Sequence, residues 1–234
     1  MYKNNLICIV QARLSSKRYP NKVLKKIIGK TVLEIINNRL RKSKYINQII
    51  FAIPNNKKNE KLKYYLKRKK INFEQGPENN VLKRFYTVIK KHKPQNIVRI
   101  TSDCPLILPT MIDKMFIAFK QGQYDYISNT VPQTFPDGFD IEIFKSECIL
   151  KALKFHLTKY DLEHVTPFIR GYKEFKKKNY YSSHKKKFSK LKLSLDTHED
   201  FMKIKKIFCF YKKIHINEKQ IFKFISKNYN FYNL

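Results

Sequence analysis

The chain has no tryptophan and little negative charge. Its 18 acidic residues stand against 50 lysines and arginines, which gives a formal net charge of +32 over 234 residues. Such an excess is typical of proteins that bind nucleic acid or an anionic membrane. Arginine, the residue that contacts bases most often, is also scarce, with eight residues against 42 lysines. Lys, Asn, Ile, Phe and Tyr share A/T-rich codons, so we favour a solvated lysine surface, with a polyanion- or nucleic-acid-binding protein as the alternative from another class.

Paired cysteines and long apolar runs are also absent. The four cysteines are far apart and form no C-x-x-C pair, which is typical of reduced, mostly buried thiols in a cytosolic protein. The first apolar run has five residues, too few for a signal peptide, and no apolar span reaches 18 residues. A hydrophobic content of 42% favours a folded globule. We therefore expect a cytoplasmic protein without a membrane segment.

Strand and helix patterns alternate along the chain, with no internal repeat and no long linker. Strands are predicted at 6–10, 49–53, 71–74, 97–101, 124–128, 139–144 and 191–195, and helices at 32–42, 60–70, 80–92, 109–120, 146–155, 161–171, 198–208 and 218–227. This order predicts an α/β fold in one domain, with a mostly parallel sheet and helices on both faces. Residues 132–171 are expected to form a small inserted lobe or dimerisation arm. Residues 175–189, with six lysines, are expected to form an exposed loop or edge hairpin.

A cationic loop follows the first predicted strand. Residues 11–22 read QARLSSKRYPNK and carry the cations Arg13, Lys17, Arg18 and Lys22 with the hydroxyls Ser15 and Ser16. Ligands of open α/β sheets bind beyond the carboxyl ends of strands, and these side chains suit a polyphosphate. The spacing matches neither the P-loop nor the dinucleotide-binding glycine motif. An ordinary basic surface loop is the alternative.

Two aspartates also follow apolar strands. Asp103 lies in T-S-D-C-P-L and Asp196 in L-S-L-D-T-H-E-D-F. Carboxylates at strand ends facing a phosphate loop are suited to hold Mg²⁺. Asp103 could instead stabilise the turn before Pro105, and Asp196 could cap the next helix, although Thr197 can take that role. Nothing in their separation of 93 positions brings them together, so a shared metal site depends on the fold.

Six stretches together carry a family resemblance over nearly the whole chain. They are IVQARLSSKRYPNKVL (9–24), ENNVLKRFY (78–86), VRITSDCPLI (98–107), DYISNTVPQTFPDGFDIEIF (125–144), LEHVTPFI (162–169) and LSLDTHEDF (193–201). The chain resembles the cytidylyltransferases that activate acid sugars, the CMP-KDO and CMP-sialate synthetase superfamily, and within it the spore coat polysaccharide branch. The resemblance implies a Rossmann-like nucleotidyltransferase fold and Mg²⁺-assisted transfer of CMP from CTP to an acid sugar of the 2-keto type, with release of pyrophosphate. It also implies a homodimer.

The resemblance assigns roles to residues of this chain. It implies catalytic roles for Arg13, Lys22, Asp103 and Asp196, with Asp103 and Asp196 as magnesium ligands. It implies nucleotide binding by Ala12, Arg13, Ser15, Arg18, Lys22, Asn80, Arg84 and Asp103, and sugar binding by Asp137, Asp140, Glu142, Glu163 and His164. One departure is Tyr19-Pro20-Asn21 in place of the more usual Leu-Pro-Gly. Asparagine tolerates a left-handed backbone, so we expect the loop geometry to be kept.

Structural alternatives exist for the sugar-side residues. Asp140 and Glu142 share one face of a strand and could form a solvent-facing acidic pair. Asp137-Gly138 is also a common turn dipeptide, and a histidine such as His164 on an amphipathic helix is more often structural than catalytic. A related nucleotidyltransferase with another nucleotide or a non-sugar acceptor stays open as a second interpretation.

Overall fold

The computed structural model describes residues 5–182, 186–228 and 232. The strands are β1 (Leu6–Gln11), β2 (Lys26–Ile27), β3 (Lys30–Thr31), β4 (Gln48–Pro54), β5 (Phe73–Gly76), β6 (Asn96–Thr101), β7 (Tyr126–Ser128), β8 (Glu142–Lys145) and β9 (Lys177–Asn179). The helices are α1 (Val32–Leu40), α2 (Glu60–Arg68), α3 (Val81–His92), α4 (Pro109–Gln121), α5 (Ser146–Ala152), α6 (Lys159–His164), α7 (Pro167–Gly171), α8 (His198–Tyr211) and α9 (Glu218–Lys227). Short 3₁₀ turns are η1 (Lys22–Leu24), η2 (Lys57–Asn59) and η3 (Lys186–Lys190).

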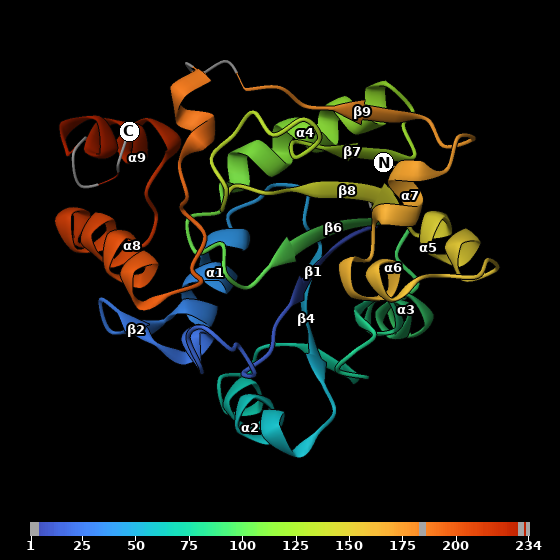
Figure 1. Cartoon of the computed structure of the whole chain (residues 1–234), viewed down its shortest axis with the longest axis horizontal. Coiled ribbons are helices and arrows are strands. Elements are labelled where there is room, and N and C mark those ends of the chain that lie inside the picture. Colours follow the sequence, from blue (N-terminus) through green and yellow to red (C-terminus); the bar gives the residue numbers. More distant parts are fainter. Residues whose placement is uncertain (1–4, 183–185, 229–231, 233–234) are drawn as a thin grey trace.

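A seven-stranded sheet in the order β5-β4-β1-β6-β8-β7-β9 forms the centre of the molecule (Figure 1). β1 pairs in parallel with both β4 and β6, β4 with β5, and β7 with β9. β8 is antiparallel to both of its neighbours, β6 and β7. The sheet is therefore mostly parallel, which confirms the predicted fold class, and a two-stranded β2–β3 ribbon stands apart from it.

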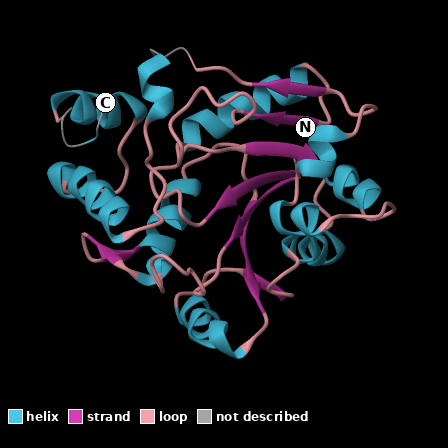
Figure 2. Ribbon diagram, in the orientation of Figure 1, coloured by secondary structure: helices cyan, strands magenta, loops and turns pink. Residues whose placement is uncertain are grey.

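Each face of the sheet is covered by its own hydrophobic core, because alternate residues of a strand point to opposite faces. Leu6, Cys8 and Val10 of β1 pack in the larger core with residues of α1, α2, α4, α8 and α9. Ile7 and Ile9 pack in the smaller core with residues of α3, α5 and α7. Figure 2 shows the helices on either side of the central strands. Both faces are thus buried, as a parallel sheet requires.

The register of β1 and β6 brings two loops to one edge of the sheet. Gln11 at the end of β1 is paired with Thr101 at the end of β6. Ser102 then donates its backbone N–H to the carbonyl of Gln11 at 3.1 Å. The cationic loop and the Asp103 loop therefore start side by side at the carboxyl ends of parallel strands.

The buried side chain of Arg39 fastens the C-terminal region to this sheet. Arg39 is 1% exposed and its guanidinium donates to the backbone carbonyls of Leu106, Ile107, Ile214 and Ile216, at 2.5 to 3.1 Å. Burial lowers its pKa to about 10. The four carbonyls replace water around the charge. They thereby join α1, the loop before α4 and the segment before α9.

Three sequence predictions were wrong in detail. The 191–195 segment is not a strand: its backbone bonds run to Asp137 and Asp103 in loops, with a single bridge between Asp137 and Lys192. The helix predicted at 161–171 is broken into α6 and α7 at Val165. In the 175–189 segment, predicted as an exposed loop or edge hairpin, Lys177–Asn179 form the parallel edge strand β9 and residues 186–189 belong to η3, while residues 183–185 lie outside the described residues.

The sequence also led to expectations about the cysteines, about membrane segments and about a lobe at residues 132–171. Cys8, Cys104 and Cys148 are buried and Cys209 is exposed, and none of the four forms a disulfide. Within the described chain, no helix combines the length and apolar character needed to cross a membrane. The division that sets residues 132–171 apart as a lobe stays a prediction; β8, α5, α6 and α7 fall in that range.

Candidate active site

Lys22 links the two strand-end aspartates. Its Nζ lies 3.3 Å from Oδ2 of Asp103 and 3.0 Å from Oδ1 of Asp196, and it donates to the carbonyl of Leu195 at 2.6 Å. Nη2 of Arg18 lies 2.9 Å from the other oxygen of Asp196. The fold therefore brings Asp103 and Asp196, which lie 93 positions apart, to Arg18 and Lys22 of the cationic loop.

The cationic loop is shaped by its own residues before it reaches Lys22. Asn21 adopts a left-handed backbone with φ 56° and ψ 20°, so the expectation that it can replace glycine here is confirmed. Tyr19 packs against the rings of His198 and Phe201 on α8, with centroids 5.7 and 5.9 Å apart. The loop is thus held against α8, which places Lys22 beside the residues just before that helix.

Asp196 is free of the capping role that the sequence left open. Thr197 and Asp200 form a reciprocal capping box at the start of α8. Burial acts to raise the pKa of Asp196, but the hydrogen bond from Lys22 and the charges of Lys22, Lys192 and Arg18 hold it below its ordinary value. The carboxylate is therefore ionised near neutral pH and faces the cationic loop. Asp103 likewise points to Lys22, so its side chain does more than stabilise a turn.

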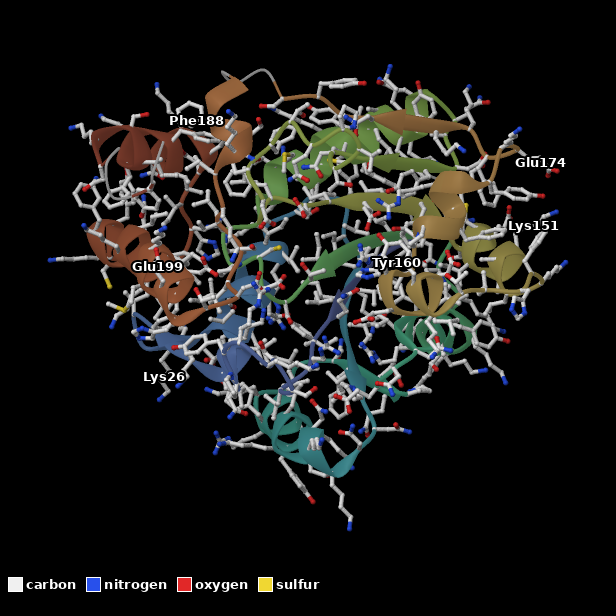
Figure 3. All side chains as sticks on the ribbon, in the orientation of Figure 1. Lys26, Lys151, Tyr160, Glu174, Phe188 and Glu199 are labelled. Atoms are coloured by element: carbon white, nitrogen blue, oxygen red, sulfur yellow. The ribbon has the colours of Figure 1, made fainter. Side chains whose placement is uncertain are left out.

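Arg13 lies in a second group, on the α3 and α6 side of the loop. Its Nη2 is 3.9 Å from Oε1 of Glu163, and its charge acts on Glu78 and Arg84. The side chains of Arg13 and Arg18 are 46% and 63% exposed, so both can meet a ligand from solvent. The cations of the loop are therefore spread along it, with Arg13 toward α6 and Arg18 and Lys22 toward α8. Figure 3 labels Tyr160 on α6 and Glu199 on α8, on opposite sides of the central strands.

Glu78 fixes the backbone of the loop next to Arg13. Its carboxylate accepts hydrogen bonds from the hydroxyl of Ser15 and from Nδ2 of Asn56, and the bond from Ser15 lowers its pKa. Asn56 accepts from Asn59 at 2.7 Å, and Asn59 in turn accepts from the N–H of Leu14 at 2.8 Å. These contacts hold the chain on either side of the Leu14–Ser15 peptide. The Ser15 hydroxyl, predicted to bind nucleotide, donates to Glu78.

Three other residues predicted to bind nucleotide have structural contacts. Asn80 caps α3 by accepting from the N–H of Lys83 at 2.7 Å. Arg84 is 2% exposed and its Nη1 donates to the carbonyls of Pro77 and Glu78, while burial, together with the charge of Arg13, lowers its pKa to about 10. Ala12 is 3% exposed, with its N–H bonded to the carbonyl of Ala52 at 3.2 Å. Their direct contact with a nucleotide stays a prediction.

Asp137 and Asp140 lie near the cluster formed by Lys22, Asp103 and Asp196. Among the described residues, neither carboxylate forms an ion pair. Oδ2 of Asp137 accepts from the hydroxyl of Ser194 at 2.6 Å, and Oδ1 of Asp140 accepts from Nε2 of Gln133 at 3.1 Å. Burial raises the pKa of Asp137, helped by the charges of Asp103 and Asp196. Burial and the charge of Asp137 raise the pKa of Asp140 to about 6. These carboxylates therefore share one electrostatic environment with the metal candidates.

The remaining residues predicted to bind sugar divide by exposure. Glu142 is 4% exposed, so it is not a solvent-facing partner of Asp140. Glu163 is exposed and faces Arg13, and the ring of the exposed His164 lies 4.3 Å from that of Tyr160. Glu163 and His164 can therefore reach a ligand, whereas Glu142 acts from within the fold.

The Asp103–Asp196 pair suits a divalent cation whose other coordination positions are filled by substrate oxygens and water. Across the described residues, no group of three or more His, Cys, Asp or Glu side chains is placed to hold a metal by itself. Mg²⁺ is commonly held by one or two carboxylates, with phosphate oxygens and water filling the other positions. Both carboxylates here already converge on one positive charge, that of Lys22. The residues present therefore suit Mg²⁺ together with a bound triphosphate.

Several residues of the site carried no clear sequence motif. Glu78, Asn56 and Asn59 act through hydrogen bonds, and their residue types are common in turns. Arg99, which donates to Glu142, had a usable signal, because it is one of eight arginines and interrupts the apolar residues Ile97, Val98 and Ile100 of β6. A charge in such a place is buried only with a partner.

Comparison with known proteins defines the class of this site. The family model described as "Cytidylyltransferase" matches residues 7–227, so the chain belongs to the cytidylyltransferase family. It is 34% identical over 224 residues to an uncharacterized protein of Methanocaldococcus jannaschii, covering 95% of this chain and 91% of that protein. It is 29% identical to the spore coat polysaccharide biosynthesis protein SpsF of Bacillus subtilis, covering 88% and 87%. The protein is therefore an enzyme, a CTP-dependent nucleotidyltransferase.

Solved structures confirm the nucleotidyltransferase fold. A cytidylyltransferase from Leptospira borgpetersenii superposes with a TM-score of 0.90 at 26% identity, covering 97% of this chain and 96% of that one. CMP:2-keto-3-deoxy-manno-octonic acid synthetase in complex with CTP superposes with a TM-score of 0.64 at 10% identity, covering 88% and 99%. At that low identity the second likeness concerns the fold alone.

Proposed function

We propose that the protein transfers CMP from CTP to the anomeric hydroxyl of a 2-keto sugar acid, with release of pyrophosphate, in the synthesis of a surface polysaccharide or glycan. The observation that carries the proposal is the contact of Lys22 with both Asp103 and Asp196 at the carboxyl edge of the sheet. The motif resemblance and the similarity to SpsF support the choice of a sugar acceptor. A cytoplasmic location and a homodimer are part of the proposal.

The reaction is a displacement at the α-phosphate of CTP. The acceptor oxygen forms a bond to phosphorus, the bond from phosphorus to the bridging oxygen breaks, and pyrophosphate leaves with the electron pair while the acceptor hydroxyl loses its proton. Negative charge is spread over phosphate oxygens in the transition state, so positioning and neutralisation do most of the catalysis. Lys22 and Arg18 supply positive charge beside the two aspartates, and Arg13 supplies it on the α6 side.

Asp103 and Asp196 would hold Mg²⁺ on the same edge. When bound, such an ion would supply neutralisation of the phosphate charge and activation of the acceptor hydroxyl. Among the described residues of the site, Asp137 and Asp140 are the best candidates for a general base, because their raised pKa values make them better proton acceptors than an ordinary carboxylate. If Asp103 and Asp196 hold such an ion, activation of the acceptor hydroxyl would not need a general base, and we place Asp137 and Asp140 in the acceptor region.

The same two aspartates favour a second candidate, CMP transfer to a neutral or cationic acceptor. An acid sugar brings its own carboxylate, and like charges repel at close range. Asp137 and Asp140 have neutral hydrogen-bond partners, Ser194 and Gln133, so they would repel such a carboxylate unless it binds toward Arg13. An acceptor without an acid group would avoid this cost.

A pyrophosphate-release screen tests the proposal. Each of the four nucleoside triphosphates is combined with Mg²⁺ and with 2-keto sugar acids, their neutral analogues and amino sugars. We expect release from CTP with a 2-keto sugar acid, and a fall of about 100-fold or more in Asp103→Asn because a metal ligand is lost. Release that requires a neutral or amino acceptor would replace the main proposal by the second. Unchanged release in a folded Asp103→Asn variant would refute the metal role.

A further inference from the structure

A buried network around Glu142 joins the edge of the phosphate loop to the turn after α6. Nη1 of Arg99 on β6 donates to Oε2 of Glu142 on β8, and Nε of Arg99 donates to the side chain of Gln11 at 3.2 Å. On the other side, the hydroxyl of Thr166 donates to Oε1 of Glu142 at 2.6 Å. Gln11 directly precedes the Ala12–Arg13 step of the cationic loop. The chain of contacts therefore runs from β1 to the residues that follow His164.

Glu142 is ionised and has little freedom to bind anything else. Its burial acts to raise its pKa, but the charge of Arg99 and the hydrogen bonds from Thr166, Tyr126 and Arg99 hold it below the ordinary value. Tyr126 donates its hydroxyl to the same Oε1 at 2.5 Å. Both carboxylate oxygens are thus bonded, and the residue is 4% exposed. A buried ion pair of this kind fixes geometry more than it stabilises the fold.

The turn held by Glu142 is strained. Val165 has φ 71° and ψ −49°, and the N–H of Thr166 donates to the carbonyl of His164 at 2.8 Å. These values are close to those of the rare γ-turn with positive φ. A β-branched residue in that region is an outlier, and such conformations persist only where the surroundings enforce them. Val165 is fully buried, and the bond from Thr166 to Glu142 fastens the residue that follows it.

The strain has a geometric effect at the active site. The γ-turn ends α6 directly after Glu163 and His164, and together with Pro167 at the start of α7 it prevents α6 and α7 from forming one continuous helix. Glu163 faces Arg13 of the cationic loop at 3.9 Å. The direction in which α6 ends therefore decides how Glu163 faces the phosphate loop, and where the exposed His164 beside it lies.

We propose that Thr166 and Glu142 are positioning residues, which hold the strained turn at Val165 so that Glu163 and His164 face the acceptor beside Arg13. Glu142 thus acts through Thr166 rather than by touching a sugar. The proposal deepens the proposed function and rests on it, since it adds the end of α6 to the acceptor side, where the proposed function places Asp137 and Asp140.

A matched pair of variants separates positioning from stability. Thr166→Val and Tyr126→Phe each remove one hydroxyl donor from the same oxygen of Glu142, but only Thr166 belongs to the turn. Each variant is expected to lower Tm by a similar amount, roughly 5 °C. Thr166→Val is expected to lower kcat/KM for the acceptor by about tenfold or more, with KM for CTP unchanged, because the reacting groups are misplaced. Tyr126→Phe is expected to keep both constants, and Thr166→Ser to restore the Thr166→Val loss.

A second readout does not depend on turnover. The imidazole signals of the six histidines are recorded by NMR, and that of His164 is assigned by its loss in His164→Gln. Thr166→Val is expected to shift the His164 signal, while Tyr126→Phe leaves it in place. Equal kinetic losses in the two variants, or an unmoved His164 signal in Thr166→Val, would overturn the positioning role. A wild-type protein that releases no pyrophosphate with any acceptor would refute the proposed function, and the NMR comparison would still decide this inference.

Discussion

Asp103 and Asp196 lie at the same edge of the sheet as Asp137 and Asp140, yet the two pairs have opposite electrostatic surroundings. The first pair shares the ammonium group of Lys22, and Asp196 also contacts Arg18. The second pair accepts hydrogen bonds from the neutral side chains of Ser194 and Gln133. As a result the pKa of Asp196 is lowered, while the pKa values of Asp137 and Asp140 are raised.

The comparison shows that the partner, rather than the residue type or the strand end, decides what an aspartate can do. A carboxylate that is paired with lysine stays charged and can hold a cation and phosphate. A buried carboxylate with neutral partners takes up a proton more readily. Two chemical roles can therefore exist within one acidic edge, one for the triphosphate and one for the acceptor.

Removal of Lys22 should have the largest effect, because it removes the cation that distinguishes the first pair. Lys22→Met is expected to lower kcat/KM for CTP by roughly 100- to 1,000-fold, as for other fixed charges that stabilise a transferring phosphoryl group. Lys192→Met is the control, since Lys192 also lies 3.4 Å from Asp196 but pairs mainly with Asp200 and is 40% exposed. Pyrophosphate release measures both variants. Equal losses would show that positive charge near Asp196, rather than the Lys22 bridge, is what matters.

Gly138 lies between Asp137 and Asp140 and packs against the backbone of Leu193 and Ser194, two residues before Asp196. Its substitution should have the next largest effect. Its φ is +104°, and a Cβ there would lie 2.5 Å from the carbonyl carbon of Leu193. Gly138→Ala is therefore expected to lower the free energy of unfolding by about 3 kcal/mol, through backbone strain and overpacking. Gly29→Ala is the control, because Gly29 has φ +78° with no atom within 4 Å of its Cβ position, and it should lose about 1 kcal/mol. Urea denaturation compares the two, and equal losses would rule out the contact with Leu193.

The pH dependence of stability should have opposite signs for Asp140 and Asp196. The pKa of Asp140 is raised from 3.8 to about 6, so its protonated form favours the fold below pH 4 and this contribution is lost as the pH rises through 6. Asp140→Asn should therefore gain about 2 kcal/mol relative to the wild type between pH 4.5 and pH 7.5. The pKa of Asp196 is lowered, so Asp196 stabilises the fold above pH 4 and Asp196→Asn should lose stability at pH 7.5.

Urea denaturation at the two pH values measures these differences. The same sign in both variants at pH 7.5 would contradict the contrast between the pairs.

The hydrogen bond from Ser194 to Asp137 should have the smallest effect. Ser194→Ala is expected to cost about 1 kcal/mol at pH 7.5, because it removes a donor from a partly buried carboxylate. A double-mutant cycle with Asp137→Asn measures the coupling of the two side chains by urea denaturation. Additive losses would show that Asp137 does not depend on Ser194 for its charge.

The sequence was sufficient for the parts of the fold that rest on local patterns. Apolar runs predicted β1, β4 and β6, and Thr197 predicted the start of α8, where the structure adds Asp200 as the second member of the capping box. Asn21 was correctly expected to take a left-handed backbone. These features depend on residues within a few positions of one another.

The other details could not be read from the sequence in the same way, mostly because they depend on contacts between distant residues. The alternating residues 191–195 suit a strand, but their backbone partners are Asp137 and Asp103 in loops, so no strand forms. The Ser15 hydroxyl donates a hydrogen bond to Glu78, 63 positions away, a contact that no local pattern indicated, and its binding to a nucleotide stays a prediction. The break near Val165 had a local signal that the prediction of one helix over 161–171 did not use, because Pro167 lies within that range and begins α7. Tertiary contacts override local preference at 191–195, whereas the break in 161–171 follows from a local rule.

The Lys22 bridge cannot form during synthesis until a long stretch of chain has been made. Asp196 follows Lys22 by 174 residues, and Ile214 and Ile216 follow Arg39 by 175 and 177. A nascent chain that ends before Asp196 has the cationic loop with one carboxylate and no cluster. Premature termination before that residue therefore yields a fragment that lacks half of its proposed metal ligands.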